Sequence, residues 1–334
     1  MSTPAWRQCA GGDPGPAVAS EYWGLPIRNA ERLDRESANA LWRLRTGDGV
    51  YVLKRLGQPA SLQWLDFQST ATRAADRAGI PVMQTIPSVS GAHTVSTTIG
   101  QCQLRRYVEG RSFQSSSSSD VAKATEMLRA LHRVPVAGLT LVPCPSANLE
   151  SWLAADETAL PELEKVLTQV VPAGLAGRAV LDYGAALDRA QNQLGAADYR
   201  SWPVALTHGE ITGSNLVLDA DGGLGTVLDW DAVQLRPRVH DLAMAALFLG
   251  RKKRGSLNID PNIARAVLEQ ATAGNPLTVA ETDVLPAVLE LYFVPTADRL
   301  ARYAKTSPQD VKWYVGWSAE GARRSRELLA PILG

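Results

Sequence analysis

Three side chains that end in oxygen follow one another in a short stretch of the chain: Glu210, Asn215 and Asp229. The apolar segments 216–218 and 225–228, separated by a turn rich in Asp and Gly, predict a tight hairpin. This hairpin would place Asn215 just before one strand and Asp229 just after the other, so that both could converge on Mg²⁺, which prefers hard oxygen ligands. Glu210 could accept or orient the proton of an attacking hydroxyl. Such a set suits phosphoryl transfer, which requires positioning and charge neutralisation; the competing interpretation is a hairpin whose Asn and Asp only cap turns.

The elements upstream could position a nucleotide against this segment. Residues 41–44 and 50–54 are two strands around a Gly-containing turn, and Lys54 ends the second strand, where its ammonium could bind phosphates. A helix over Ser61–Ala78 is predicted to end at Gly79-Ile80-Pro81. Further strands are expected at 82–89, 91–95 and 103–108. Five serines at 115–119 predict a flexible surface loop, and Asp120 is predicted to cap a helix over 121–133.

Composition excludes several classes of protein. The 334 residues carry 34 basic and 34 acidic side chains, so no global positive field favours nucleic acid. The three cysteines are too scattered for a disulfide framework or a zinc site. No apolar run is long enough for a membrane span, and the N-terminus lacks the apolar core of a signal peptide. We therefore expect a cytoplasmic protein with no nucleic-acid or membrane partner.

The segment from His208 to Ala243, HGEITGSNLVLDADGGLGTVLDWDAVQLRPRVHDLA, resembles the aminoglycoside phosphotransferase and choline kinase-like superfamily. That family shows an HGDxxxxN loop, a hairpin, a metal-binding Asp and a downstream Asp-Leu-Ala. The resemblance covers the chain from about residue 30 onward. It implies an α+β, bilobal, protein-kinase-like fold, with a small β-rich N-lobe that has one main helix and a larger, mostly helical C-lobe. We expect a loosely ordered lead-in at 1–25, the N-lobe at 26–106 and the C-lobe at 107–334.

The resemblance also implies roles for single residues, with ATP and Mg²⁺ as cofactors. Glu210 takes the position of the catalytic base, and Asn215 and Asp229 take those of the metal ligands. The residues implied to bind the nucleotide are Lys54 on the α- and β-phosphates, Ser37 in the phosphate-covering loop, Gln68 as partner of the lysine, and Tyr107 and Val108 at the hinge that contacts adenine. His208 and Asp241 are implied to brace the loop, whereas Asp231 is left open as a second carboxylate, a substrate contact or a surface residue.

Three departures from the family pattern bear on function. Glu210 stands where the family has Asp, which moves the carboxylate out by more than about 1 Å, a displacement that matters in catalysis. Gln68 stands where the family has the Glu that pairs with the lysine, and a neutral amide would orient Lys54 less strongly. The loop 35–39 contains no glycine, so that serine hydroxyls and backbone amides would have to contact phosphate.

The favoured function is an ATP- and Mg²⁺-dependent phosphotransferase that acts on a hydroxyl of a small molecule, such as an antibiotic, an amino alcohol or a sugar. One alternative is a kinase for Ser or Thr of a peptide in natural-product modification, which would have a peptide substrate or a partner protein. The other is a pseudokinase that binds nucleotide or serves as a scaffold. Glu210 and Gln68 favour the pseudokinase, whereas the retained Lys54, Asn215 and Asp229 speak against it.

Overall fold

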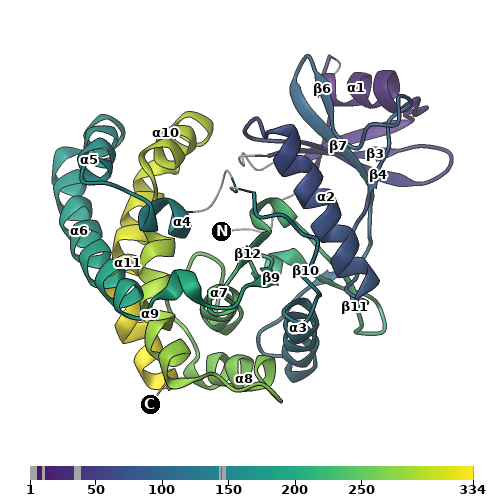
Figure 1. Cartoon of the computed structure of the whole chain (residues 1–334). Coiled ribbons are helices and arrows are strands. Elements are labelled where there is room, and N and C mark those ends of the chain that lie inside the picture. The colour runs from purple at the N-terminus through teal and green to yellow at the C-terminus, as the bar shows by residue number, and fades with distance from the viewer. Residues whose placement is uncertain (1–5, 10–11, 34–38, 143, 145–147, 334) are drawn as a thin grey trace.

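The computed structural model describes residues 6–9, 12–33, 39–142, 144 and 148–333. Within them the chain forms a small β-rich lobe and a larger, mostly helical lobe, as Figure 1 shows. The predicted α+β, two-lobed architecture is therefore confirmed. The strands are β1 (Trp6–Gln8), β2 (Asn29–Leu33), β3 (Ala40–Arg45), β4 (Val50–Arg55), β5 (Thr85–Ile86), β6 (Val95–Thr97), β7 (Gly100–Arg106), β8 (Arg111–Ser112), β9 (Ala205–Thr207), β10 (Leu216–Leu218), β11 (Leu224–Val227) and β12 (Gln234–Arg236).

Helices make up most of the larger lobe. In chain order, the helices of both lobes are α1 (Pro14–Trp23), α2 (Leu62–Arg77), α3 (Ser118–Leu131), α4 (Asn148–Leu153), α5 (Ala159–Val170), α6 (Ala173–Ala196), α7 (Val239–Gly250), α8 (Pro261–Ala271), α9 (Val279–Phe293), α10 (Ala297–Thr306) and α11 (Val311–Leu333). The described residues also form the 3₁₀ turns η1 (Tyr199–Ser201), η2 (Gly213–Asn215) and η3 (Trp230–Ala232), which lie next to strands β9 to β12. None of the helices in the described ranges combines the length and the apolar character that a membrane crossing needs.

The small lobe is built on an antiparallel sheet in the order β1-β2-β3-β4-β7-β5, with β6 also paired to β7 in the described residues. β3 and β4 form the predicted hairpin. β4 also pairs with β7, which sets Lys54 opposite Gln103 and Leu53 opposite Leu104. Opposite residues of an antiparallel pair share one face, so Leu53 and Leu104 face one way and Lys54 and Gln103 the other. The predicted strands at 82–89 and 91–95 shorten to β5 and the start of β6, and both pair with β7.

The expected lead-in at 1–25 differs from the structure, which places β1 and α1 there. The Asp13 side chain accepts a hydrogen bond from the Gly15 N–H at 3.1 Å, and Pro14 opens the helix, which together make a favourable N-terminus. Val18 and Trp23 are buried in one core with the Leu53 face of the sheet. The segment is rich in Gly, Pro and Ala, so its composition does not predict a helix. Tertiary packing, which helix propensity does not include, stabilises it.

Helix α2 begins after Ser61, whose hydroxyl accepts from the Trp64 N–H at 3.2 Å, and the chain turns away at Gly79, where φ is +83°. Both ends agree with the prediction. The apolar face of α2, from Trp64 to Ala75, is buried in the core of the large lobe, whereas the sheet and α1 share a separate small core. The Val227 N–H of β11 donates to the Pro81 carbonyl at 2.8 Å. Helix α2 is thus packed with the large lobe.

Helix α3 corrects two predictions. Its N-cap is Ser117, which accepts from the Asp120 N–H at 3.2 Å, and the serines at 118 and 119 form its first turn. Asp120 is therefore inside the helix. Its buried carboxylate pairs with Arg111 at 2.6 Å and accepts from the Gln114 N–H at 2.9 Å. The sequence pattern misplaced the cap because serine and aspartate are both strong N-cap residues.

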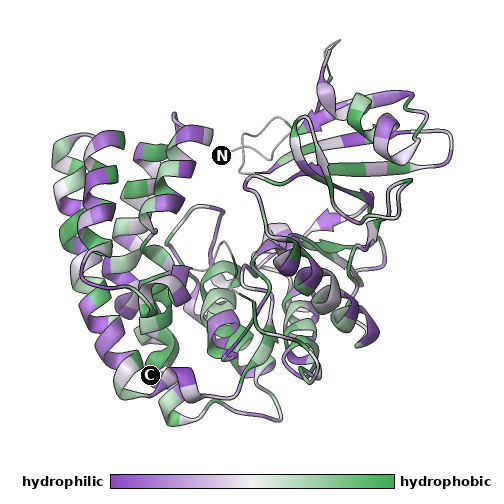
Figure 2. Cartoon of the chain, turned by 45° about the horizontal axis from the view of Figure 1, so that its top comes forward, coloured by the Kyte–Doolittle hydropathy of each residue, from purple (hydrophilic) through white to green (hydrophobic). Residues whose placement is uncertain are grey.

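The core of the large lobe is centred on α7, all of whose residues are buried. Helices α8 and α9 pack against it, and α6 and α11 pack in turn against α9 (Figure 1). In Figure 2 the outer helices carry both hydrophilic and hydrophobic residues. Amphipathic helices of this kind bury one stripe and expose the other. The fully buried carboxylate of Glu290 in α9 is held by Arg189 of α6 at 2.9 Å and Arg326 of α11 at 3.2 Å, which fastens three helices together.

Two small sheets carry the segment that the sequence singled out. β10 and β11 form the predicted hairpin, with Leu216 opposite Val227, and β8 joins the outer side of β10. β9 pairs with β12. His208 therefore follows directly after β9, Asn215 precedes β10, and Asp229 follows β11 with one residue between.

Candidate functional site

A buried carboxylate fixes the loop that begins at His208. Asp241, at the start of α7, accepts from the His208 N–H at 2.7 Å and from the Gly209 N–H at 2.8 Å. Burial alone would raise the pKa of Asp241, but the imidazoles of His132 and His240, at 3.5 and 3.7 Å, help to hold the pKa far below its usual range. Asp241 therefore stays ionised, and charge-assisted hydrogen bonds of this kind are strong. The predicted bracing role agrees with this geometry.

His208 is a neutral structural residue. Its Nε2 lies 2.8 Å from the Leu228 carbonyl, and its Nδ1 accepts from the Glu210 N–H at 3.3 Å. A carbonyl only accepts, so the network assigns the proton to Nε2. Burial lowers the pKa of His208, mainly because the charged form loses water. The imidazole thus connects the loop to the end of the hairpin and does not act as a base.

Gly209 allows the loop to turn. Its φ is +85°, a region that side chains rarely adopt, and a Cβ there would lie 2.3 Å from the Ala232 carbonyl oxygen. The next residue, Glu210, has a side chain that is 34% exposed. The loop therefore presents the carboxylate of Glu210 while its backbone stays buried. This is the position at which the sequence predicted the base.

The charge of Glu210 is set by two opposing effects. The carboxylate is partly withdrawn from water, which raises the pKa of Glu210, and the guanidinium of Arg299 in α10, 3.7 Å from Oε1, acts against that rise. The net direction is upward, which favours proton acceptance because a base should have a pKa close to the working pH.

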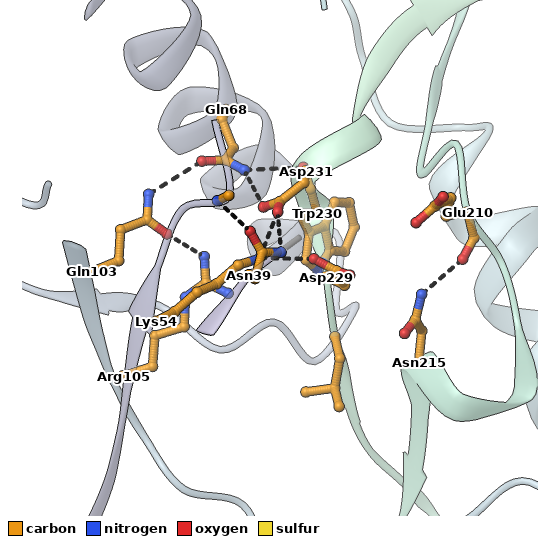
Figure 3. Close-up of polar contacts among 12 residues, drawn as sticks. Asn39, Lys54, Gln68, Gln103, Arg105, Glu210, Asn215, Asp229, Trp230 and Asp231 are labelled. Carbon is orange, nitrogen blue, oxygen red and sulfur yellow. Dashed lines mark hydrogen bonds and ion pairs between the residues drawn. The ribbon is translucent and has the colours of Figure 1, made fainter. Parts of the chain in front are cut away.

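Asn215 and Asp229 lie at the same end of the hairpin, as predicted. The Leu228 N–H donates to the Asn215 carbonyl at 2.7 Å, which closes that end. The Asn215 amide nitrogen donates to the Glu210 carbonyl at 2.9 Å, so its amide oxygen remains for another partner (Figure 3). Asp229 has a φ of +61°, and non-glycine residues held there are concentrated at functional sites. The structure therefore places the two predicted metal ligands at one end of the hairpin.

These two oxygens fit Mg²⁺ as part of a nucleotide site. The described residues contain no group of three or more His, Cys, Asp or Glu that could hold a metal alone. Magnesium usually takes one or two protein ligands and completes its shell with phosphate oxygens and water. A single carboxylate and a single amide oxygen match that requirement.

Lys54 crosses from the sheet to the hairpin. Its Nζ lies 2.7 Å from Asp229 Oδ1 and 2.7 Å from Asp231 Oδ2, and its side chain is only 6% exposed. Burial alone would lower the pKa of Lys54, but the two carboxylates raise it. Lys54 is therefore charged and held by two anions, one of which is the predicted metal ligand.

Asp231 is itself held from two sides. Asn39 donates to its Oδ2 at 2.9 Å and Gln68 to its Oδ1 at 3.3 Å, and Gln68 also donates to the Trp230 carbonyl at 3.1 Å. Figure 3 shows these groups around the two aspartates. The sequence had implied that Gln68 is the partner of Lys54. Its position on α2, counted from Gly79, is correct, but Gln68 donates to Asp231 and the Trp230 carbonyl instead. It positions Asp231, which together with Asp229 is the ionic partner of Lys54.

The remaining nucleotide-site predictions have different outcomes. Ser37 lies outside the described residues. Tyr107 and Val108 follow β7 and are partly exposed, with the Tyr107 N–H donating to the Val50 carbonyl at 2.9 Å. They lie at the predicted connection between the lobes, and their contact with adenine stays a prediction.

Sequence reasoning left the role of Asp231 open and missed Arg299. The sequence did mark Asp231 as a candidate, because it lies two positions after Asp229. Its ion pair could not be predicted, because the partner Lys54 is 177 residues away in the chain. Arg299 gave no local signal, since it lies on a polar helix face that only the folded chain directs toward Glu210. A separate groove of about 1120 Å³, lined by Gly255, Trp313, Trp317 and Glu320 among others, contains none of these site residues.

A family model described as "Phosphotransferase enzyme family" matches residues 29–275. No curated protein matches the sequence. Several solved structures share the fold at low sequence identity.

Three of these structures cover nearly the whole chain. A microcompartment-associated aminopropanol kinase is 18% identical with a TM-score of 0.65, over 96% of this chain and 99% of that one. An aminoglycoside phosphotransferase from Alicyclobacillus acidocaldarius is 14% identical with a TM-score of 0.61, over 97% and 98%. A spectinomycin phosphotransferase in complex with ADP and its antibiotic is 12% identical with a TM-score of 0.61, over 93% and 97%. These likenesses confirm the predicted kinase-like fold.

Proposed function

Because the chain belongs to the phosphotransferase enzyme family, we propose that it transfers the terminal phosphoryl group of ATP, with Mg²⁺, to a hydroxyl group of a small molecule. The observation that carries this proposal is the bridge from Lys54 to two carboxylates at 2.7 Å each. One lysine with two anionic partners can release Asp229 to a metal and still be held by Asp231. A decayed site would have no reason to retain both.

The residues divide the work of binding. Lys54 would bind the α- and β-phosphates while Asp231 fixes its direction. Asn215 and Asp229 would hold Mg²⁺, which when bound neutralises the charge that develops on the phosphoryl oxygens. The strained backbone of Asp229 fixes that carboxylate at the end of the hairpin in advance. Positioning of this kind supplies much of the rate in phosphoryl transfer.

Glu210 would accept the proton of the acceptor hydroxyl. Its backbone is held by Asp241 through the neighbouring residues, so that the longer side chain extends from a fixed loop. The extra methylene of Glu relative to Asp moves the carboxylate further from the loop backbone. The acceptor hydroxyl would therefore be bound correspondingly further from that backbone. Arg299, beside Glu210, keeps the carboxylate from becoming protonated too easily.

The class of acceptor is proposed from the site and from related structures. By their names, proteins with this fold include an aminopropanol kinase, a spectinomycin phosphotransferase and a phosphotransferase solved with hygromycin B. Aminopropanol, spectinomycin and hygromycin B all carry hydroxyl groups. We therefore favour a small hydroxylated molecule over a peptide. A peptide substrate becomes the next candidate if ATP binds but small acceptors are not phosphorylated.

The proposal is tested by thermal unfolding with ATP, with and without Mg²⁺. At a nucleotide concentration of 100 Kd the expected stabilisation is about 2.7 kcal/mol, or roughly 4 °C for a chain of this length. Asp229→Ala should lose the Mg²⁺-dependent part. Asp221→Ala, at an exposed position in the turn of the same hairpin, is the matched control and should keep it.

The outcomes are distinct. A Mg²⁺-dependent shift in the wild type and in Asp221→Ala, absent in Asp229→Ala, supports the metal–nucleotide site and leads to a screen of hydroxylated acceptors by release of ADP. No shift in the wild type at millimolar ATP would refute the proposed function. An unchanged shift in Asp229→Ala would refute the assignment of the metal ligand.

A further inference from the structure

The sheet presents a second buried cation beside Lys54. Gln103 lies opposite Lys54 in the β4–β7 pair, and Arg105 is two residues further along β7. Side chains two apart on a strand share a face, so Lys54, Gln103 and Arg105 all project from the same side of the sheet. Figure 3 shows the side chain of Arg105 alongside that of Lys54. Both point toward the end of the hairpin that carries Asp229 and Asp231.

Arg105 is not paired as a buried charge normally is. It is only 7% exposed, and its Nη2 donates to the neutral Gln103 Oε1 at 2.8 Å. Its Nε has no hydrogen-bond partner among the described residues, and none of their carboxylates forms an ion pair with it. Buried arginines are almost always paired because an unpaired buried charge is unfavourable. A guanidinium left in this condition indicates an anion that is absent from the protein itself.

The charges nearby show where that anion would bind. Asp229 and Asp231 act on Arg105 from a distance and partly offset the fall in its pKa that burial causes, but both are engaged by Lys54. The two cations and two aspartates leave this cluster neutral overall. A nucleotide with Mg²⁺ still carries net negative charge, and Arg105 is the cation of the cluster whose donors are not already engaged by carboxylates.

We propose that Arg105 is a second phosphate-binding residue of the nucleotide site and contacts the α-phosphate. The position along the strand supports the α-phosphate, because Arg105 lies between the register of Lys54 and the connection at Tyr107, where the nucleoside is expected. A guanidinium suits this role because its planar donors match two phosphate oxygens. The inference rests on the proposed function, since it requires a nucleotide in the cleft.

Binding of a graded series of ligands tests the proposal. Adenosine, AMP and ADP are titrated by calorimetry into the wild type and Arg105→Met, with ADP measured in the presence of Mg²⁺. Arg105→Met should weaken AMP and ADP about tenfold or more, as expected for the loss of charge-assisted hydrogen bonds, and should change adenosine by less than about twofold. Arg105→Lys, which keeps the charge without the planar fork, should fall between the two proteins.

The neighbouring arginine provides the control. Arg106 is exposed and its side chain lies over the ring of Tyr51, on the opposite face of the sheet. Arg106→Met should bind all three ligands as the wild type does. Because Arg105 is buried without an ion pair, Arg105→Met should also unfold at the same temperature as the wild type or higher in the absence of ligand.

Three results would overturn the proposal. Equal weakening of adenosine, AMP and ADP would assign Arg105 to the base or to packing. Unchanged AMP and ADP affinities would remove it from the phosphate site. A fall in unfolding temperature with unchanged affinities would make it structural. If the wild type bound none of the ligands, the proposed function would fail first, so the two failures are distinguishable.

Discussion

Asp231 should contribute strongly to stability because it stays ionised in the folded state. Burial would raise the pKa of Asp231, but Lys54, with smaller contributions from Arg105 and Asn39, lowers the pKa from 3.8 to about 2. At about 1.4 kcal/mol per pKa unit, the fall from 3.8 to about 2 corresponds to about 2 kcal/mol of folding free energy. The side chain is 23% exposed, so solvent screening removes little of this value. Asp231→Asn, which keeps the shape and removes the charge, should lower the free energy of unfolding by up to about 2 kcal/mol at pH 7.

The effect must depend on pH with a definite sign. A carboxyl whose pKa is depressed by folding contributes stability that is fully present above its unfolded pKa and is lost as pH falls through its folded pKa. The difference between wild type and Asp231→Asn should therefore be constant above about pH 5 and should shrink to about half by pH 3. Urea denaturation, followed by tryptophan fluorescence over this pH range, measures the difference directly.

A matched control and a functional measurement complete the experiment. Asp221→Asn, exposed in the hairpin turn, should change the free energy of unfolding by less than about 0.5 kcal/mol. In Asp231→Asn, Lys54 should remain on Asp229 and compete with the metal, so that binding of ATP with Mg²⁺ weakens. A loss below about 0.5 kcal/mol, or a loss that is the same at pH 7 and pH 3, would refute the argument that Asp231 is the ionic partner of Lys54.

The remaining predictions concern Glu210, the loop that carries it and Arg299 beside it. Glu210→Gln should lower kcat by about 10²–10⁴ with little change in the KM for ATP, because it removes the proton acceptor; Glu210→Asp should lower kcat by about 10², and a gain of activity would instead indicate a decayed site. In the profile of kcat/KM against pH, activity should fall as pH drops through the raised pKa of Glu210, above the usual value of about 4.3. Arg299→Met, which removes the opposing cation, should move this fall to still higher pH, and a shift to lower pH would contradict the role given to Arg299. Gly209→Ala should destabilise the protein by more than about 2 kcal/mol in denaturation, because a Cβ would lie 2.3 Å from the Ala232 oxygen; wild-type stability would show that the loop can shift freely.

Local chemistry made several parts of the site predictable. The hairpin between Asn215 and Asp229 has a turn whose Asp and Gly residues determine its geometry, so both flanking ligands could be placed. Gln68 could be placed by counting back along α2 from the Gly79 stop signal, since a helix has a fixed period. The role of Asp241 came from the resemblance rather than from local pattern.

Other features depend on contacts between distant segments, which pattern cannot show. The sequence assigned the partner of Lys54 to Gln68 on α2. In the structure Asp231, which follows the β10–β11 hairpin, forms an ion pair with Lys54 and Gln68 donates to Asp231. Helix α1 was hidden because its stability comes from Trp23 and Val18 against the sheet. The cap of α3 was misplaced by three residues because the choice between Ser117 and Asp120 depended on Arg111, which binds the aspartate.

The packing of α2 has a mechanical consequence for how the cleft opens. Since α2 shares the core of the large lobe and the sheet shares its core with α1, the rigid bodies are not the two halves suggested by the strand-rich outline in Figure 1. If the sheet and α1 move as one body, Gln68 and Asp231 stay together and Lys54 moves relative to both. The ion pairs of Lys54 with Asp229 and Asp231 then hold the sheet to the large lobe and must break when the cleft opens. Amide hydrogen exchange should then divide the chain into two cooperative units, with α2 exchanging in step with α7 rather than with β4.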